Sequence, residues 1–92
     1  KRRGQFWIEL KVTKGNQIGL SSGQISWHMS HNTNGGCSFI MATPLGRGGV
    51  SIFSGARALS LAKEGLSLEP CAFFPEPCAW TDLETWLVDH VP

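Results

Sequence analysis

The sequence reads Phe6-Trp7-Ile8-Glu9-Leu10-Lys11-Val12-Thr13 close to its N-terminal end, and two kinds of side chain alternate through this stretch without a break. In an extended chain, successive side chains point to opposite faces. One face would carry the apolar set Phe6, Ile8, Leu10 and Val12, and the other would carry Trp7, Glu9, Lys11 and Thr13. The alternation predicts a half-buried β-strand over residues 6–13, with Glu9 and Lys11 on the same face.

The residues after this strand predict a turn followed by a helix. Lys14-Gly15-Asn16-Gln17 has the composition of a turn. Ser21 and Gln24 have the spacing of a capping box, in which each side chain accepts a hydrogen bond from the other residue's backbone at a helix start. We expect a helix over residues 22–32 that ends at Asn34-Gly35-Gly36, because glycine tolerates the left-handed backbone that follows many helices.

Two further strands and a second helix are expected downstream. Cys37–Ala42 is a short apolar run, which predicts a strand buried on both faces, and its helical connection to the first strand predicts a βαβ unit. Val50–Phe53 predicts another strand, and Ser54 is expected to cap a helix over residues 55–64. These elements predict an α/β fold with a small mixed sheet flanked by helices.

The C-terminal third is expected to be irregular until a final helix. Three prolines make regular structure unexpected over residues 66–80. Thr81-Asp82-Leu83-Glu84 has the form of a second capping box and predicts a terminal helix. One stripe of that helix would dock on the sheet through Leu83, Trp86, Leu87 and either His90 or Val91.

Length and composition favour one compact domain. Ninety-two residues with 41% hydrophobic content are enough for one core but not for two. The chain has no apolar run long enough to cross a membrane and no apolar signal region after Lys1-Arg2-Arg3, so a soluble, cytoplasmic protein is expected. Three cysteines, Cys37, Cys71 and Cys78, fit neither a disulfide framework nor zinc-finger spacing, and we expect ordinary thiols.

Positive charge is concentrated at one end of the chain. The formal net charge is only +1, yet residues 1–14 hold Lys1, Arg2, Arg3, Lys11 and Lys14 against the single Glu9. Such asymmetry would let one edge of the domain face phosphates. The alternative interpretation is a solvated terminal tail.

Glu9 and Lys11 are the residues with the clearest chemical potential. A carboxylate can bind a divalent cation that polarises a scissile phosphate and activates water. An ammonium beside it can orient that water or stabilise the negative charge that grows in the transition state. The alternative is an ordinary exposed ion pair, which is the common fate of a Glu and a Lys two positions apart.

The order of motifs resembles the VRR-NUC branch of the PD-(D/E)xK nucleases. The matching features are a strand with Glu-x-Lys, a turn, a Leu-Ser-x-x-Gln helix start with an aromatic residue on the helix, a Gly-Gly pair and a buried strand. They correspond here to Ile8–Gly15, Leu20–Trp27 and Gly35–Ile40.

The resemblance implies a restriction-endonuclease-like core and a Mg²⁺- or Mn²⁺-dependent endonuclease that acts as a homodimer on branched or flapped DNA. It implies that Glu9 is a metal ligand, that the backbone carbonyl of Leu10 is a further ligand, that Lys11 is the catalytic lysine and that Gln24 is the active-site glutamine. The capping box alone also explains Gln24. Basic residues expected to contact the DNA backbone are Lys1, Arg2, Arg3, Lys14 and, in a glycine-rich loop, Arg47.

One part of the family pattern is missing. Family members carry an acidic residue, usually the Asp of a Pro-Asp pair, on a strand before Glu-x-Lys, and a more distant Glu on an N-terminal helix. Here only six residues precede the position of Trp7, and the sole aspartates are Asp82 and Asp89. We therefore expect residues 1–92 to be the C-terminal portion of a longer domain. A second interpretation has Asp82 or Glu84 reach the site from the terminal helix or from a partner subunit.

Three aromatic residues on the first helix are expected to have structural roles. Trp27 is interpreted as core or interface rather than as a platform for base stacking. His28 and His31 are three positions apart but have no third metal ligand at useful spacing, so both are expected to be exposed or capping. Two rival functions also remain: a non-catalytic nucleic-acid-binding module with the nuclease fold, and a structural or interaction domain.

Overall fold

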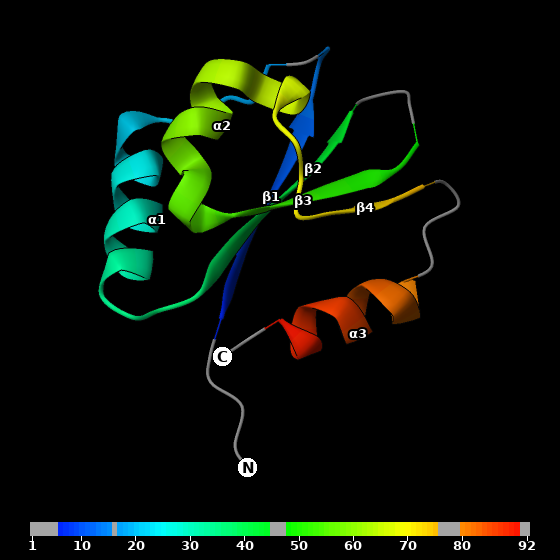
Figure 1. Ribbon diagram of the computed structural model, residues 1–92. Coiled ribbons are helices and arrows are strands. Elements are labelled where there is room, and N and C mark those ends of the chain that lie inside the picture. The colour runs from blue at the N-terminus through cyan, green and yellow to red at the C-terminus, as the bar shows by residue number, and fades with distance from the viewer. Residues whose placement is uncertain (1–5, 16, 45–47, 76–79, 91–92) are drawn as a thin grey trace.

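The computed structural model describes residues 6–15, 17–44, 48–75 and 80–90 (Figure 1). These residues form a four-stranded mixed sheet in the order β1-β2-β3-β4 and three α-helices. The strands are β1 (Trp7–Thr13), β2 (Ser38–Pro44), β3 (Val50–Ser54) and β4 (Ala72–Phe74). The helices are α1 (Ser22–Thr33), α2 (Ala58–Glu64) and α3 (Trp80–Asp89), with 3₁₀ turns at Gly55–Arg57 and Gly65–Ser67 on either side of α2. The predicted mixed α/β fold is confirmed at this level.

The N-terminal half is the βαβ unit that the sequence predicts. β1 and β2 are parallel neighbours joined through α1, and Glu9 and Lys11 lie in register with Ile40 and Ala42. Ser21 and Gln24 form the capping box at the start of α1. A parallel pair requires such a crossover connection, so the helix is brought against the face of the strands that it joins.

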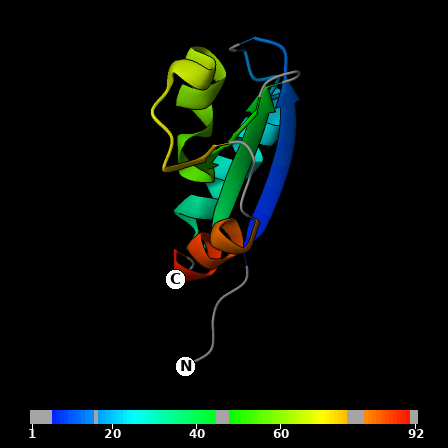
Figure 2. The same cartoon turned by 90° about the vertical axis from the view of Figure 1, so that its right-hand side faces the viewer.

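The sheet has a hydrophobic cluster on each face, and β2 contributes to both. One cluster joins the sheet to the residues before α1 and to α2 and consists of Ile18, Ile40, Ala42, Phe53, Ala58, Leu61 and Leu68. The other lies under α3 and consists of Cys37, Phe39, Met41, Val50, Ile52, Leu83 and Leu87. Figures 1 and 2 show α1 and α2 grouped together and α3 apart from them. The expected burial of both faces of β2 is confirmed.

The strand β1 is half-buried, as predicted, but its sheltered face is the polar one. Ile8, Leu10 and Val12 are 41%, 63% and 62% exposed, whereas Glu9 and Lys11 are partly covered and Thr13 is buried. Among the described residues β1 has a strand neighbour only in β2, so the other side of β1 is a sheet edge. A strand whose polar side chains are sheltered beside a helix is positioned to build a polar site.

Two predictions for the C-terminal third are wrong. Residues 72–74 form β4, which pairs with β3, so the proline-rich segment contributes a strand after all. α3 begins at Trp80, so Thr81 lies inside the helix rather than capping it, and its carbonyl accepts from Thr85 Oγ at 2.9 Å. The expected docking stripe is confirmed for Leu83 and Leu87, which are buried against the sheet, and for Trp86, which packs on the same cluster. His90 is exposed, and Val91 lies outside the described residues.

No helix in the described part of the chain is long and apolar enough to span a membrane.

Candidate functional site

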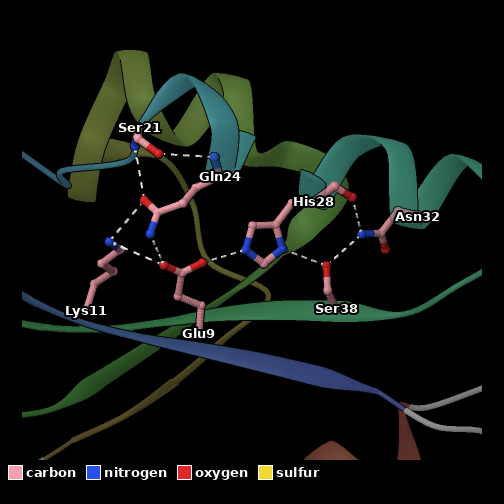
Figure 3. Close-up of polar contacts among 7 residues, drawn as sticks. All are labelled: Glu9, Lys11, Ser21, Gln24, His28, Asn32 and Ser38. Carbon is pink, nitrogen blue, oxygen red and sulfur yellow. Dashed lines mark hydrogen bonds and ion pairs between the residues drawn. The ribbon is translucent and has the colours of Figure 1, made fainter. Parts of the chain in front are cut away.

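Glu9, Lys11 and Gln24 meet in one hydrogen-bonded group between β1 and the first turn of α1 (Figure 3). Lys11 Nζ lies 3.3 Å from Glu9 Oε2 and donates to Gln24 Oε1 at 3.1 Å. Gln24 Nε2 donates to the same carboxylate oxygen at 2.6 Å. The two strand residues share a face because they are two positions apart, and α1 places the amide above them. The structure therefore brings the three residues proposed from the sequence into direct contact.

Gln24 serves the helix and the site at once. Its backbone N–H donates to Ser21 Oγ, and its Oε1 accepts from the Ser21 backbone N–H at 3.0 Å, which completes the capping box. The same Oε1 accepts from Lys11, while the Nε2 is directed at Glu9. The two interpretations of this glutamine are compatible, because the capping geometry holds the side chain in the orientation that the site uses.

His28 also belongs to the site, so the expectation of an exposed or capping histidine is wrong. The residue is 1% exposed, and its Nε2 lies 2.9 Å from Glu9 Oε1. Its Nδ1 lies 2.8 Å from Ser38 Oγ on β2. The signal that finds it is a spacing on the helix: Gln24, His28 and Asn32 are four positions apart and form one polar stripe facing the sheet.

Both ring nitrogens of His28 have a partner in this buried chain, and the direction of these two hydrogen bonds depends on the tautomer. Asn32 Nδ2 donates to Ser38 Oγ at 2.7 Å and also to the His28 carbonyl. If Ser38 donates onward to Nδ1, then Nε2–H donates to the Glu9 carboxylate. Every donor and acceptor between Asn32 and Glu9 is then used, as a buried polar group requires.

Gly55 encloses the buried end of this chain. A Cβ at Gly55 would overlap Ser38 Oγ and would lie 2.8 Å from both Asn32 Nδ2 and His28 Nδ1. The absence of a side chain is therefore what lets the turn after β3 cover Ser38 and His28. Under this turn Ser38 is only 1% exposed, so its hydroxyl cannot reach a substrate. Ser38 therefore positions His28 and does not take part in catalysis directly.

Competing effects act on the Glu9 carboxyl. Burial alone would raise its pKa, but hydrogen bonds from His28 and Lys11 and the positive charge of Lys11 outweigh burial and hold the pKa below its ordinary value. Glu9 is therefore an anion at neutral pH, available to counter a cation.

The lowered pKa of Glu9 predicts a loss of stability in acid. A carboxyl with a lower pKa in the folded chain stabilises the fold fully above its unfolded-state pKa of about 4.3, and this contribution is lost as the pH falls through the folded-state value. We expect the urea midpoint of the wild type to fall more steeply as the pH is lowered below about 5 than that of Glu9→Gln, which has no titrating group at this position. If the urea midpoints of the two proteins changed with pH in parallel, the ionised Glu9 carboxylate would contribute nothing to the stability of the fold.

Leu10 directs its backbone carbonyl toward the open edge of the sheet. Trp7 N–H donates at 3.1 Å to the carbonyl of Cys37, the residue just before β2, and the backbone groups of successive strand residues point to opposite sides. Glu9 is two positions after Trp7, so its backbone N–H and C=O groups also point toward β2. The backbone groups of Leu10 point away from β2. The proposed second ligand is thus not used by the β1–β2 pairing.

The donors at this site fit a divalent cation only as part of a ligand set. A carboxylate has about four acceptor positions, and His28, Gln24 and Lys11 occupy three of those on Glu9. No cluster of three or more His, Cys, Asp or Glu side chains that could hold a metal ion occurs among the described residues. The Glu9 carboxylate is the hard oxygen donor within this group.

Asp82 and Glu84 of the same chain do not complete the set. Both are exposed on α3, which packs against the face of the sheet that carries Phe39 and not against the face that carries Glu9. The suggestion that they reach the site within one chain is therefore wrong. Of the expected DNA contacts, Lys14 is exposed just beyond β1, and Lys1, Arg2, Arg3 and Arg47 lie outside the described residues.

Trp27 is not a core residue, in contrast to one sequence-based expectation. Its side chain is 45% exposed, and it lies edge-to-face with Trp7, the ring centroids being 6.2 Å apart. His31 stacks on Trp27 with centroids 4.8 Å apart and is partly buried, so the expectation that His31 is exposed or capping is also wrong.

Comparison of the chain with protein-family models, with curated proteins and with solved structures finds no match.

Proposed function

We propose that this domain is a divalent-metal-dependent endonuclease that hydrolyses phosphodiester bonds in DNA, with branched or flapped DNA as its substrate. The observation that carries the proposal is the group formed by Glu9, Lys11 and Gln24, which is supported from behind by the buried His28. The parallel β1-α1-β2 unit that presents this group supports a restriction-endonuclease-like core. Such a group combines anionic, cationic and amide side chains whose orientations are fixed before substrate arrives.

Glu9 and the Leu10 carbonyl would hold Mg²⁺ or Mn²⁺, with a further carboxylate from outside the described residues or from a partner subunit. When bound, the cation would supply Lewis acidity at the scissile phosphate. His28 fixes the rotamer of Glu9 through Oε1, and Gln24 fixes the other oxygen. Because both oxygens of the carboxylate are already held, the Glu9 side chain loses little conformational entropy when the cation binds, and this favours cation binding.

Lys11 would act directly on the phosphate. Its ammonium has three N–H donors, of which one contacts Glu9 and one Gln24, so a third remains for a phosphate oxygen. The ammonium would neutralise part of the negative charge that develops on the phosphate in the transition state. Gln24 accepts one hydrogen bond from the Lys11 ammonium, so that not all of its N–H donors are directed at Glu9.

The test of the proposal is a cleavage assay with the wild-type chain on end-labelled four-way, flap and linear duplex DNA. We expect products in Mg²⁺ or Mn²⁺, none in EDTA, and faster cutting of the branched substrates than of the linear duplex. Absence of cleavage on all three substrates with either metal ion would overturn the proposal.

A second candidate function is a nucleic-acid-binding module without catalysis. It is favoured by the fact that both carboxylate oxygens of Glu9 already accept from protein donors. Such a module would shift the same DNA substrates uncut in Mg²⁺, with affinity falling as salt rises. A domain that only binds other proteins would not shift them.

We also propose that the nuclease works as a homodimer, because two symmetric cuts in a junction require two sites. Sedimentation of the free protein and of its complex with a four-way junction tests this. A complex with one subunit per junction would contradict it.

A further inference from the structure

We propose that Trp7 and Trp27 form a stacking site for the unpaired bases of single-stranded DNA, next to the group formed by Glu9, Lys11 and Gln24. The inference rests on the proposed nuclease function and specifies the part of a flapped or branched substrate that the domain recognises. It concerns two side chains that the proposed catalysis does not use.

The two indoles are close to each other and close to the candidate site. Trp7 is two positions before Glu9 on β1 and lies on the same side of the strand. Trp27 is next to His28 on α1, and its ring lies edge-on to the His28 imidazole with centroids 5.0 Å apart. Because the buried His28 contacts both Glu9 and Trp27, the aromatic pair lies directly beside the carboxylate between β1 and α1.

Both indoles remain accessible although large aromatic side chains usually provide buried area. Trp7 is 56% exposed and Trp27 is 45% exposed, and the two rings meet at an angle of 88°. Trp27 is nevertheless held in place, because His31 stacks on it with an interplanar angle of only 8°. His31 is itself confined by Gly36, where a Cβ would overlap the imidazole ring. A fixed and exposed ring loses little conformational freedom when a ligand stacks on it.

The chemistry beside the pair favours a nucleobase over an apolar peptide. Lys11 lies on the same face of β1 as Trp7, and its ammonium keeps one N–H donor beyond those used by Glu9 and Gln24. A single strand whose bases stack on the indoles would carry its phosphates toward the Lys11 ammonium, and aromatic rings beside a cationic side chain are the combination that single-strand-binding surfaces use. The aliphatic side chains of β1, which would suit an apolar partner, lie on the opposite face.

The experiment compares base and backbone contributions directly. The full chain is titrated, in EDTA to prevent cutting, into a fluorescein-labelled oligothymidylate and into an abasic oligonucleotide of equal length, and binding is followed by anisotropy. Trp7→Leu and Trp27→Leu are tested beside Trp80→Leu, a matched control that removes a 60%-exposed indole from α3. Circular dichroism and urea midpoints establish that each variant is folded.

We expect the wild type to bind oligothymidylate more tightly than the abasic strand. Loss of either Trp7 or Trp27 should weaken oligothymidylate binding by about 5-fold or more, since stacking contributes about 1–3 kcal/mol per base, and should leave abasic binding unchanged. Trp80→Leu should match the wild type. The stacking site would be overturned if the wild type bound the two oligonucleotides equally tightly, or if all three variants lost the same amount of binding. It would also be overturned if Trp7→Leu or Trp27→Leu changed the oligomeric state of the protein but left base-dependent binding unchanged.

The nuclease and the stacking site can fail separately. Metal-dependent cleavage without any preference for bases over abasic backbone removes the stacking site and leaves the nuclease. Indole-dependent binding of oligothymidylate without cleavage of any substrate removes the nuclease and leaves a single-strand-binding surface.

Discussion

Replacing Lys11 with methionine is expected to reduce Mg²⁺-dependent DNA cleavage by about 100- to 1000-fold while the domain stays folded, because an oriented donor at a developing charge contributes a factor of this size. Methionine keeps the length and the apolar stem of the side chain but cannot neutralise a phosphate. Glu9→Gln should have an effect at least as large, since it removes the carboxylate that meets both Lys11 and His28. Single-turnover rates on the preferred branched substrate measure both losses.

The helix α2 offers matched controls for these two substitutions. Lys63 and Glu64 are adjacent, exposed residues at the end of α2 and are not part of the group around Glu9. Lys63→Met and Glu64→Gln make the same changes in charge and should cleave at the wild-type rate. If Lys11→Met and Lys63→Met cleaved equally well, the Glu9–Lys11 pair would be an ordinary structural ion pair and the proposed nuclease would lose its chemical basis.

Stability measurements separate a chemical loss from a folding loss. Lys11 is a partly buried partner of Glu9, and ion pairs near a surface contribute about 0–1 kcal/mol. The urea midpoint of Lys11→Met should therefore stay close to that of the wild type. Loss of cleavage together with a large fall in the midpoint would point to unfolding instead of to a missing catalytic group.

The βαβ unit was predictable because its signals are local. A two-residue alternation defines β1, the Ser21–Gln24 spacing defines the start of α1, and an apolar run between glycine and proline defines β2. Each of these patterns depends on residues that are close in sequence and on backbone geometry alone. The pairing of Glu9 with Lys11 on one face follows from the same geometry.

The sheltered polar face of β1 and the burial of His28 depend on tertiary contacts and were not predictable with the same rules. Periodicity says which side chains share a face, but it does not say which face a helix covers, and the apolar face of β1 is the one left exposed. His28 reaches across 19 positions to Glu9 and across 10 to Ser38. A lone histidine on a helix is usually a surface residue, and only the repeat of polar residues every fourth position on α1 indicated otherwise.

The errors near the C-terminus have a different cause. β4 spans only three residues, and a strand this short has too few positions to show an alternation. Pairing with β3 establishes it, so the tertiary contact overrides the local preference of a proline-rich segment. At α3 a threonine with a suitable spacing suggested a cap, although the helix had already begun at Trp80. Helix boundaries are the least certain part of such patterns.

The largest effect on stability from a small change is expected for Gly55→Ala. The added methyl group would overlap Ser38 Oγ and would press on Asn32 Nδ2 and His28 Nδ1, all of which are fixed by hydrogen bonds to one another. Overpacking costs about 1–3 kcal/mol and a buried donor or acceptor that loses its partner a similar amount, so a loss of about 2–4 kcal/mol is expected. In a domain of this size such a loss lowers the melting temperature by about 10–20 °C.

Gly19→Ala is the matched control, because a Cβ at Gly19 meets nothing within 4 Å. It makes the same chemical change at an exposed position and should shift the unfolding free energy by no more than about 0.5 kcal/mol. Since Ser38 and His28 hold Glu9 from behind, Gly55→Ala should also reduce cleavage at temperatures where the variant is still folded. Equal melting temperatures for the two variants would contradict the close contact at Gly55. A destabilised Gly55→Ala that cleaves at the wild-type rate would instead show that the chain from Asn32 to Glu9 stabilises the fold without positioning the carboxylate.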